Sequence, residues 1–134
     1  MHWMIAEDEA DIRMLVSTMA MAWGHTTLQF ESGQKAWDFL DKVEAGEYKS
    51  PLPEFALMDI RMPGYRGDEV AKRIRETKAI KDIPIVLMTA FILSEQEVRQ
   101  MKAESGVDHV INKPLPDFMK FKEILDTVIS SKKK

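Results

Sequence analysis

The chain has 134 residues, a net charge of −3 and no cysteine. Its length fits one domain whose core is large enough to be stable without cross-links, and the lack of cysteine excludes disulfides and thiolate metal sites. No apolar stretch is long enough for a membrane span, and the N-terminus lacks the pattern of a secretory signal. The charge distribution is not that of a nucleic-acid-binding protein. We therefore expect one cytoplasmic domain at 1–134, with a short lysine-rich tail at 131–134 and no direct contact with membrane or nucleic acid.

Short apolar runs alternate with stretches of helical period along the first part of the chain. The pattern predicts a strand at 2–6, a helix at 10–23 and an edge strand at 25–31. The helix would end at Gly24, because glycine commonly follows the last turn of a helix. One face of this helix carries the apolar residues Ile12, Leu15, Val16, Met19 and Trp23.

The same alternation continues through the middle of the chain. Ser32 or Gly33 can cap a second helix. Its apolar stripe consists of Ala36, Phe39, Leu40 and Val43. The segments expected next are a loop at 46–53, a strand at 54–58, a turn-rich loop at 61–67 and a helix at 68–77 that buries Val70 and Ile74.

The last third of the chain predicts two more strands and two more helices. A continuous apolar run at 83–88 is typical of an interior strand. Ser94 and Glu97 form a capping box for a helix at 95–105, which Gly106 ends. A strand at 107–111 follows, and Pro116 is expected to open the last helix. The apolar face of that helix consists of Phe118, Phe121, Leu125 and Val128.

Five strands and five helices in strict alternation indicate a repeated βα unit and a parallel sheet. Right-handed crossover connections then place helices on both faces of the sheet. The predicted fold is therefore α/β, a three-layer αβα sandwich around a five-stranded parallel sheet. The chain carries no internal repeat or low-complexity segment, so a single domain is expected.

Polar residues stand at the ends of four predicted strands. Glu7 and Asp8 follow the first strand, Asp59 the third, Thr89 the fourth and Lys113 the fifth. The carboxyl ends of parallel strands share one edge of the sheet, and open α/β sheets bind ligands at that edge. Three carboxylates, one hydroxyl and one ammonium group there suit a hard metal ion beside a phosphoryl group.

Asp59 is the leading candidate for the reactive group, because a carboxylate can attack a phosphoryl donor and carry an acyl phosphate. The transfer needs a cation that offsets charge on the donor oxygens. Mg²⁺ could be held by Glu7, Asp8, Asp59 and the backbone carbonyl of Arg61. Lys113 could then pair with one phosphoryl oxygen and Thr89 could donate a hydrogen bond to another.

Each of these residues also has an ordinary structural explanation when it is taken alone. An acidic pair after a strand can simply begin a helix, and a strand-terminal aspartate can form a turn. A threonine is a common strand residue, and most lysines are solvated. The coincidence of such groups at four separate strand ends is what favours a functional site.

Together the motifs resemble the receiver domain of two-component response regulators, of the chemotaxis CheY type. The matching segments are Ala6-Glu7-Asp8-Glu9 through Asp11-Ile12-Arg13, Leu57-Met58-Asp59-Ile60-Arg61-Met62-Pro63, Met88-Thr89-Ala90, and Gly106-Val107-Asp108 leading to Lys113-Pro114. The resemblance extends from residue 3 to about residue 130. It implies a flavodoxin-like, CheY-like (βα)5 fold and a cis peptide bond between Lys113 and Pro114.

The resemblance also implies a signalling function. A sensor histidine kinase or a phosphotransfer protein would donate a phosphoryl group to Asp59, Mg²⁺ would be the cofactor, and Thr89 and Lys113 would sense the phosphoryl group. The module would catalyse its own phosphorylation and dephosphorylation without being a turnover enzyme. It would switch a surface for a downstream effector that the sequence does not identify, as a monomer or a weak phosphorylation-dependent dimer.

Some positions depart from the family pattern. Glu7 stands where an aspartate is common, and its longer arm should still reach the metal. Val110 stands where tyrosine or phenylalanine is usual, so output is expected through backbone shifts alone. Arg66 replaces the aspartate usually found before Gly67. We also predict that Arg61, together with Phe91, tunes how readily water reaches the acyl phosphate.

Two other functions stay open on the residues alone. A phosphatase of the haloacid dehalogenase type also uses a strand-end aspartate, but that class needs a second aspartate where Arg61 stands, and no cap domain is expected here. A degenerate receiver would bind a partner without being phosphorylated. The chemical competence of all five site residues argues against that second alternative.

Overall fold

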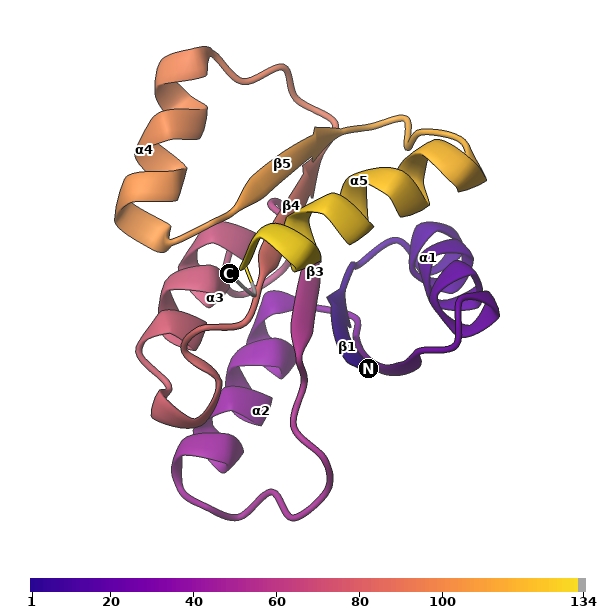
Figure 1. The fold of residues 1–134 in the computed structure, drawn as a ribbon. Helices are drawn as coiled ribbons and strands as arrows, with labels where there is room; N and C mark the ends of the chain where they lie inside the picture. The colour runs from indigo at the N-terminus through magenta and orange to yellow at the C-terminus, as the bar shows by residue number, and fades with distance from the viewer. Residues whose placement is uncertain (133–134) are drawn as a thin grey trace.

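The computed structural model describes residues 1–132, in which five strands and five α-helices alternate strictly along the chain (Figure 1). A short 3₁₀ turn, η1, lies between the third helix and the fourth strand. The elements are β1 (His2–Ala6), α1 (Ala10–Ala22), β2 (Thr26–Phe30), α2 (Gly33–Glu44), β3 (Phe55–Asp59), α3 (Gly67–Arg75), η1 (Lys78–Ile80), β4 (Ile85–Thr89), α4 (Glu95–Ser105), β5 (His109–Asn112) and α5 (Phe118–Lys132).

All neighbouring strands pair in parallel, in the order β2-β1-β3-β4-β5. β2 is therefore an edge strand and β4 an interior one, as predicted. Alternate residues of each strand enter opposite cores: Met4 packs with α2 and α3, whereas Trp3 packs with α1 and α5. Figure 1 shows α1 and α5 on one side of the sheet and the other three helices on the opposite side. The three-layer sandwich is confirmed.

Several predicted helix signals are also confirmed. Ser32 caps α2, where its hydroxyl oxygen accepts a hydrogen bond from the backbone N–H of Lys35 at 3.1 Å. Ser94 and Glu97 make both hydrogen bonds of the capping box that begins α4. Gly106 ends α4 with a φ of 71°, in the left-handed region that glycine adopts without strain.

The prediction was wrong about parts of two helix faces. Leu15 is 52% exposed, and α1 instead approaches the sheet through Val16, Met19 and the small residues Ser17 and Ala20. The buried face of α1 is thus centred on residues 16–20, and Leu15 lies outside it. In α5, Phe118 is 44% exposed. The buried face of that helix consists of Phe121, Leu125 and Ile129.

Some element boundaries also differ from the prediction. β4 begins at Ile85, because Pro84 has no N–H to donate to the sheet. α5 begins at Phe118 and not at Pro116, because the carboxylate of Asp117 accepts a hydrogen bond from the Lys120 N–H at 2.9 Å and so caps the helix. β3 and β4 end one residue later than expected, so that Asp59 and Thr89 are themselves the last residues of their strands.

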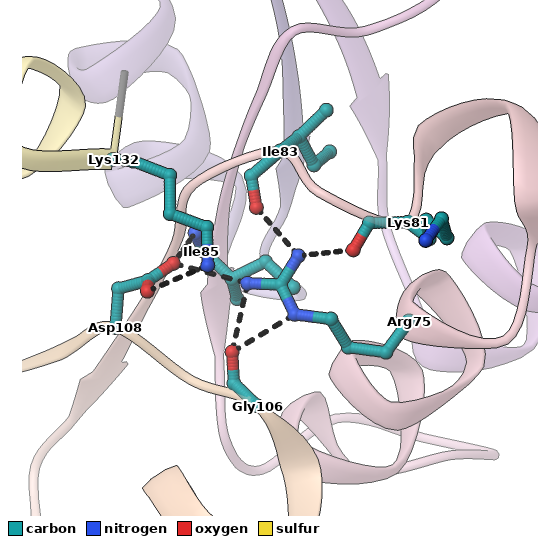
Figure 2. Close-up of polar contacts among 7 residues, drawn as sticks. All are labelled: Arg75, Lys81, Ile83, Ile85, Gly106, Asp108 and Lys132. Atoms are coloured by element: carbon teal, nitrogen blue, oxygen red, sulfur yellow. Dashed lines mark hydrogen bonds and ion pairs between the residues drawn. The ribbon is translucent and has the colours of Figure 1, made fainter. Parts of the chain in front are cut away.

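A polar cluster around Arg75 ties several elements together at the N-terminal end of the sheet (Figure 2). Asp108, just before β5, accepts hydrogen bonds from Arg75 at 3.0 Å and from the Ile85 N–H at 2.8 Å. Lys132, in the last turn of α5, lies 3.3 Å from the same carboxylate. Residues 131 and 132 of the predicted tail are thus helical, while 133 and 134 lie outside the described residues. Between residues 1 and 132, no helix has the length and apolarity needed to cross a membrane.

Candidate functional site

The strand register brings the predicted polar residues to one edge of the sheet. Ala6 pairs with Met58, Asp59 with Met88 and Thr89 with Asn112. The ends of β1, β3, β4 and β5 are therefore level. Glu7 follows β1 directly and Lys113 follows β5 directly, and both side chains reach this edge.

The three carboxylates at this edge are close enough to share one metal ion. Oxygen atoms of Glu7, Asp8 and Asp59 all lie within 4.8 Å of one another. Their environments differ, because Glu7 and Asp59 are buried whereas Asp8 is exposed. With all three carboxylates ionised, the single ammonium group of Lys113 leaves a formal charge of −2, which suits a divalent cation with oxygen ligands.

A cavity of about 180 Å³ opens at this cluster. It is lined by Asp8, Glu9, Asp59, Arg61, Thr89, Ala90, Phe91 and Lys113. Other hollows, of about 230 to 460 Å³, are larger. Within residues 1–132, however, the grouped carboxylates with metal-binding spacing are those of Glu7, Asp8 and Asp59, so chemistry and not size identifies the candidate site.

Lys113 is held by two of the carboxylates. Its Nζ lies 2.7 Å from Glu7 Oε1 and 3.3 Å from Asp59 Oδ2. Burial opposes the charged form of this lysine, but the hydrogen bonds and charges of the two carboxylates outweigh burial and raise the pKa of Lys113. The ammonium group is therefore charged at neutral pH and stands beside the candidate reactive oxygen.

Glu7 is the completely buried member of the cluster. Burial is the main cause that raises the pKa of Glu7 to about 7; the hydrogen bond from Lys113 lowers the pKa, and the neighbouring Asp59 raises it. Both carboxylate oxygens are engaged, since Oε2 accepts a hydrogen bond from the Glu9 N–H at 3.4 Å. The guanidinium of Arg13 donates to the Glu7 backbone carbonyl at 2.7 Å and fixes the chain at this point.

Thr89 is 2% exposed at the end of β4. Its hydroxyl oxygen accepts a hydrogen bond from the Phe91 N–H at 3.0 Å, which leaves the hydroxyl proton able to donate. The backbone carbonyl of Thr89 also accepts a hydrogen bond from the Lys113 N–H at 2.7 Å. Thr89 and Lys113 are thus coupled through their backbones. The predicted cis bond between Lys113 and Pro114 is confirmed.

Arg61 and Phe91 lie against each other at the cavity. The guanidinium carbon of Arg61 is 4.0 Å from the centre of the Phe91 ring, a cation–π contact. Both residues line the cavity, and Phe91 is about half exposed.

Sequence reasoning assigned no role to Glu9 or Arg13, although both belong to the matched motif. Glu9 lines the cavity, with its carboxylate 4.0 Å from Lys113 Nζ, and Arg13 fixes the backbone of Glu7. The acidic run 7–9 was the available signal for Glu9. Nothing in the sequence indicates that Arg13 folds back over six residues to bond a backbone carbonyl.

Comparison with known proteins agrees with this geometry. The family model of the response regulator receiver domain matches residues 3–126. The phosphate regulon transcriptional regulatory protein PhoB of Escherichia coli is 31% identical over 111 residues, which cover 83% of this chain and 44% of PhoB. A chemotaxis protein CheY homolog of Campylobacter jejuni is 29% identical over 132 residues, which cover 98% of this chain and 94% of the homolog.

One solved structure shares the fold closely. It is the receiver domain of the sensor histidine kinase PA1611 from Pseudomonas aeruginosa, solved with a magnesium ion coordinated in the active site cleft. The two chains align with a TM-score of 0.75 and 21% identity, over 96% of this chain and 97% of that one. Several curated relatives are longer proteins. The matched segment covers 21% of a cyclic di-GMP phosphodiesterase response regulator from Xanthomonas campestris and 44% of PhoB, so the chain spans less than half the length of these relatives.

Proposed function

The chain belongs to the response regulator receiver domain family, the phosphoacceptor modules of two-component signalling, and from this premise we propose that Asp59 accepts the phosphoryl group. One observation carries the proposal. Asp59 ends an interior strand inside a cavity, 3.3 Å from Lys113 and within 4.8 Å of carboxylate oxygens of Glu7 and Asp8. This is the arrangement that a carboxylate nucleophile beside a divalent cation requires.

The proposed cofactor is Mg²⁺, with Glu7, Asp8, Asp59 and the backbone carbonyl of Arg61 as its protein ligands. The formal charge of −2 and the all-oxygen donor set support this assignment. Mg²⁺ would supply positive charge to the phosphoryl oxygens. Asp8 and Asp59 line the cavity directly. Each oxygen of Glu7 accepts one hydrogen bond and keeps a second lone pair, with which Glu7 could serve as a ligand.

The transfer step follows from the positions of the side chains. A carboxylate oxygen of Asp59 forms a bond to phosphorus while the bond between phosphorus and the donor's imidazole nitrogen breaks, and the imidazole leaves with the electron pair. Lys113 then pairs with a phosphoryl oxygen through an ammonium group that already contacts Asp59. Thr89 donates its hydroxyl proton to another phosphoryl oxygen. Water later hydrolyses the acyl phosphate and restores Asp59.

The phosphatase alternative is not favoured. The family match is to receiver domains, which in general are signalling modules and not turnover enzymes. Arg61 occupies the position at which the haloacid dehalogenase class needs its second aspartate, and its guanidinium packs on Phe91 instead of acting as an acid. The degenerate-receiver alternative is disfavoured because the acidic cluster, Thr89 and Lys113 converge at one cavity edge.

The proposed phosphodonor is a sensor histidine kinase or a phosphotransfer protein. A hollow of about 460 Å³ beside the site suits its docking, because the hollow is mainly apolar and includes Lys113. Its lining residues are Ile12, Leu15, Met19, Lys113, Pro114, Leu115, Pro116 and Phe118. We also propose that the protein is cytoplasmic and acts on a downstream effector that is still to be identified. It would do so as a monomer or as a weak phosphorylation-dependent dimer.

Labelling with acetyl phosphate in the presence of Mg²⁺ tests the acceptor. We expect wild type to be labelled and Asp59→Asn to lose the label, whereas the control Asp82→Asn, at an exposed residue away from the site, keeps it. Equal labelling of Asp59→Asn and wild type would overturn the assignment. Steady hydrolysis of a phosphate ester by wild type would instead favour the phosphatase.

Thermal unfolding tests the metal site separately. Lys113 compensates only part of the charge of the three clustered carboxylates, so Mg²⁺ should bind the folded state and raise the melting temperature. At ten times the dissociation constant, the expected gain is about 1.4 kcal/mol. Asp8→Asn should reduce the response. An unchanged melting temperature at saturating Mg²⁺ would contradict the site.

A further inference from the structure

The N-terminal turn of α2 contacts the loop that follows Asp59. The carbonyl oxygen of Pro63 accepts hydrogen bonds from the backbone N–H groups of Gly33 at 3.0 Å and Gln34 at 3.4 Å. The first N–H groups of a helix have no partner within the helix, so an outside acceptor must satisfy them. Here that acceptor is the loop 60–66. The beginning of α2 and this loop therefore hold each other in place.

The two backbones approach so closely that glycine is needed on both sides. A Cβ atom at position 33 would overlap the backbone carbonyl oxygen of Tyr65. A Cβ atom at position 64 would lie 2.7 Å from Gln34 Cβ, and Gly64 also has a φ of 83°. Backbone atoms cannot move aside to make room for a Cβ atom, as the end of a flexible side chain could. The loop is thus held by direct contact with the first turn of α2.

An aromatic pair holds the same loop from one turn further along α2. The Tyr65 ring stacks on the Trp37 ring with centroids 3.9 Å apart and an angle of 13° between their planes. Arg73 of α3 approaches the Trp37 ring at 5.5 Å and forms an ion pair with Asp41 of α2 at 3.0 Å. The loop is therefore attached to α2 at Trp37, which Arg73 of α3 also contacts.

The other attachments of the loop involve Ile60, the residue that follows Asp59. The Ile60 N–H donates to the Met88 carbonyl at 2.9 Å, and the Gly67 N–H donates to the Ile60 carbonyl at 2.8 Å. A Cβ atom at position 67 would overlap the Asp59 carbonyl oxygen. Arg61 lies between these attachments and lines the cavity. A displacement of the loop at Pro63 or Tyr65 would thus be transmitted to the segment 59–61.

We propose that Gly33 and the stacked pair Trp37 and Tyr65 are positioning residues for the phosphoacceptor site. They fix the loop 60–66 and so set the placement of the Asp59 carboxylate and the Arg61 carbonyl, although no residue of α2 lines the cavity. Ligand sets need placement to about 0.5 Å, so a small shift of the loop is enough to weaken metal binding. This inference rests on the proposed function, because it concerns the Mg²⁺ site of that proposal.

Calorimetric titration with MgCl₂ alone, without a phosphodonor, tests the proposal. Gly33→Ala should weaken Mg²⁺ binding by at least about fivefold, the lower end of typical coupling between distant groups. Gly46→Ala is the matched control. Gly46 has a φ of 73° and no atom within 4 Å of an added Cβ, so this variant bears backbone strain without touching the loop. We expect it to lower the melting temperature while Mg²⁺ binds with wild-type affinity.

A second pair of variants keeps the test decisive if Gly33→Ala does not fold. Tyr65→Leu removes the aromatic stack without a change at any glycine, and it should also weaken Mg²⁺ binding. Tyr65→Phe keeps the stack and should bind Mg²⁺ with wild-type affinity. Wild-type affinity in both Gly33→Ala and Tyr65→Leu would overturn the positioning role. A wild-type protein that binds no Mg²⁺ would overturn the proposed function itself, and the two failures are thereby distinguished.

Discussion

Lys113 and Glu7, 106 residues apart in the sequence, form a buried ion pair of 2.7 Å at the candidate site. The pair joins the end of β1 to the end of β5 across the sheet. Lys113 also reaches Asp59, so a single ammonium group compensates two buried carboxylates. The site is therefore preassembled around a cation that belongs to the protein.

Replacement of Lys113 by methionine should destabilise the metal-free protein. The variant leaves Glu7 and Asp59 buried without their counter-charge, and breaking a buried ion pair typically costs about 3 to 5 kcal/mol. We expect a loss of about 3 kcal/mol in the free energy of unfolding at pH 8, measured by urea titration in EDTA. The double variant Glu7→Gln/Lys113→Met should recover part of that loss. Equal stability of wild type and Lys113→Met would contradict the role assigned to the pair.

The stability of the metal-free protein should depend on pH through Glu7. Burial raises the pKa of Glu7 from 4.5 to about 7, so the folded state binds this proton more tightly than the unfolded state does. Between these two pH values the unfolded chain has lost the proton and the folded protein keeps it. The contribution of Glu7 to the free energy of unfolding therefore falls as pH rises, by about 3 kcal/mol in total.

Glu7→Gln isolates this contribution, because glutamine does not titrate. The free energy of unfolding of the variant, relative to wild type, should increase between pH 4.5 and pH 7 and then level off. Urea titrations at several pH values, all in EDTA, measure the difference. Histidine contributions cancel because both proteins share them. Parallel pH profiles for the two proteins would show that Glu7 does not titrate in this range.

The order of elements was predictable because it depends on local alternation. Strand-end residues such as Asp59 and Lys113 could be grouped from the sequence alone, since parallel strands share one carboxyl edge. Which face of each helix is buried was less predictable. Leu15 and Phe118 fit the helical period of their apolar faces, yet both are exposed, because the orientation of a helix depends on which partner surface it meets.

Contacts between distant segments were not predictable at all. No local pattern indicates that Tyr65 stacks on Trp37 or that Gly33 meets the Tyr65 carbonyl. The role of Arg13 is similarly hidden, since its hydrogen bond runs to a backbone atom, which carries no sequence signal. The strand-end pattern predicts which residues meet at the edge of the sheet, whereas these contacts refine how they are placed there.

Arg61 and Phe91 are predicted to control how fast the acyl phosphate hydrolyses. The guanidinium carbon of Arg61 lies 4.0 Å from the centre of the Phe91 ring, and both residues line the cavity that contains Asp59, so we expect them to limit the access of water. Arg61→Ala and Phe91→Ala should each speed dephosphorylation by about five- to thirtyfold, which corresponds to about 1 to 2 kcal/mol in the barrier. The loss of label after removal of acetyl phosphate measures the rate. Ile92→Ala is the control, because Ile92 is 92% exposed and does not line the cavity; unchanged rates in the two cavity variants would discard the idea.

Arg75 should support the fold without acting on the site. All five of its N–H donors are used: they reach the carbonyls of Lys81 at 2.8 Å, Ile83 at 2.6 Å and Gly106 at 2.8 and 3.1 Å, and the carboxylate of Asp108 at 3.0 Å (Figure 2). This side chain therefore joins α3, the turn before β4, the end of α4 and the start of β5.

Arg75→Met should lower the free energy of unfolding by about 2 to 4 kcal/mol, because an unsatisfied buried polar group costs about 1 to 3 kcal/mol and several are left here. Lys72→Met, on an exposed position of the same helix, is the control and should change stability little. Mg²⁺ affinity should be the same in both variants, because the cluster lies at the opposite end of the strands from Asp59. A loss of Mg²⁺ affinity in Arg75→Met alone would mean that the two ends of the sheet are coupled.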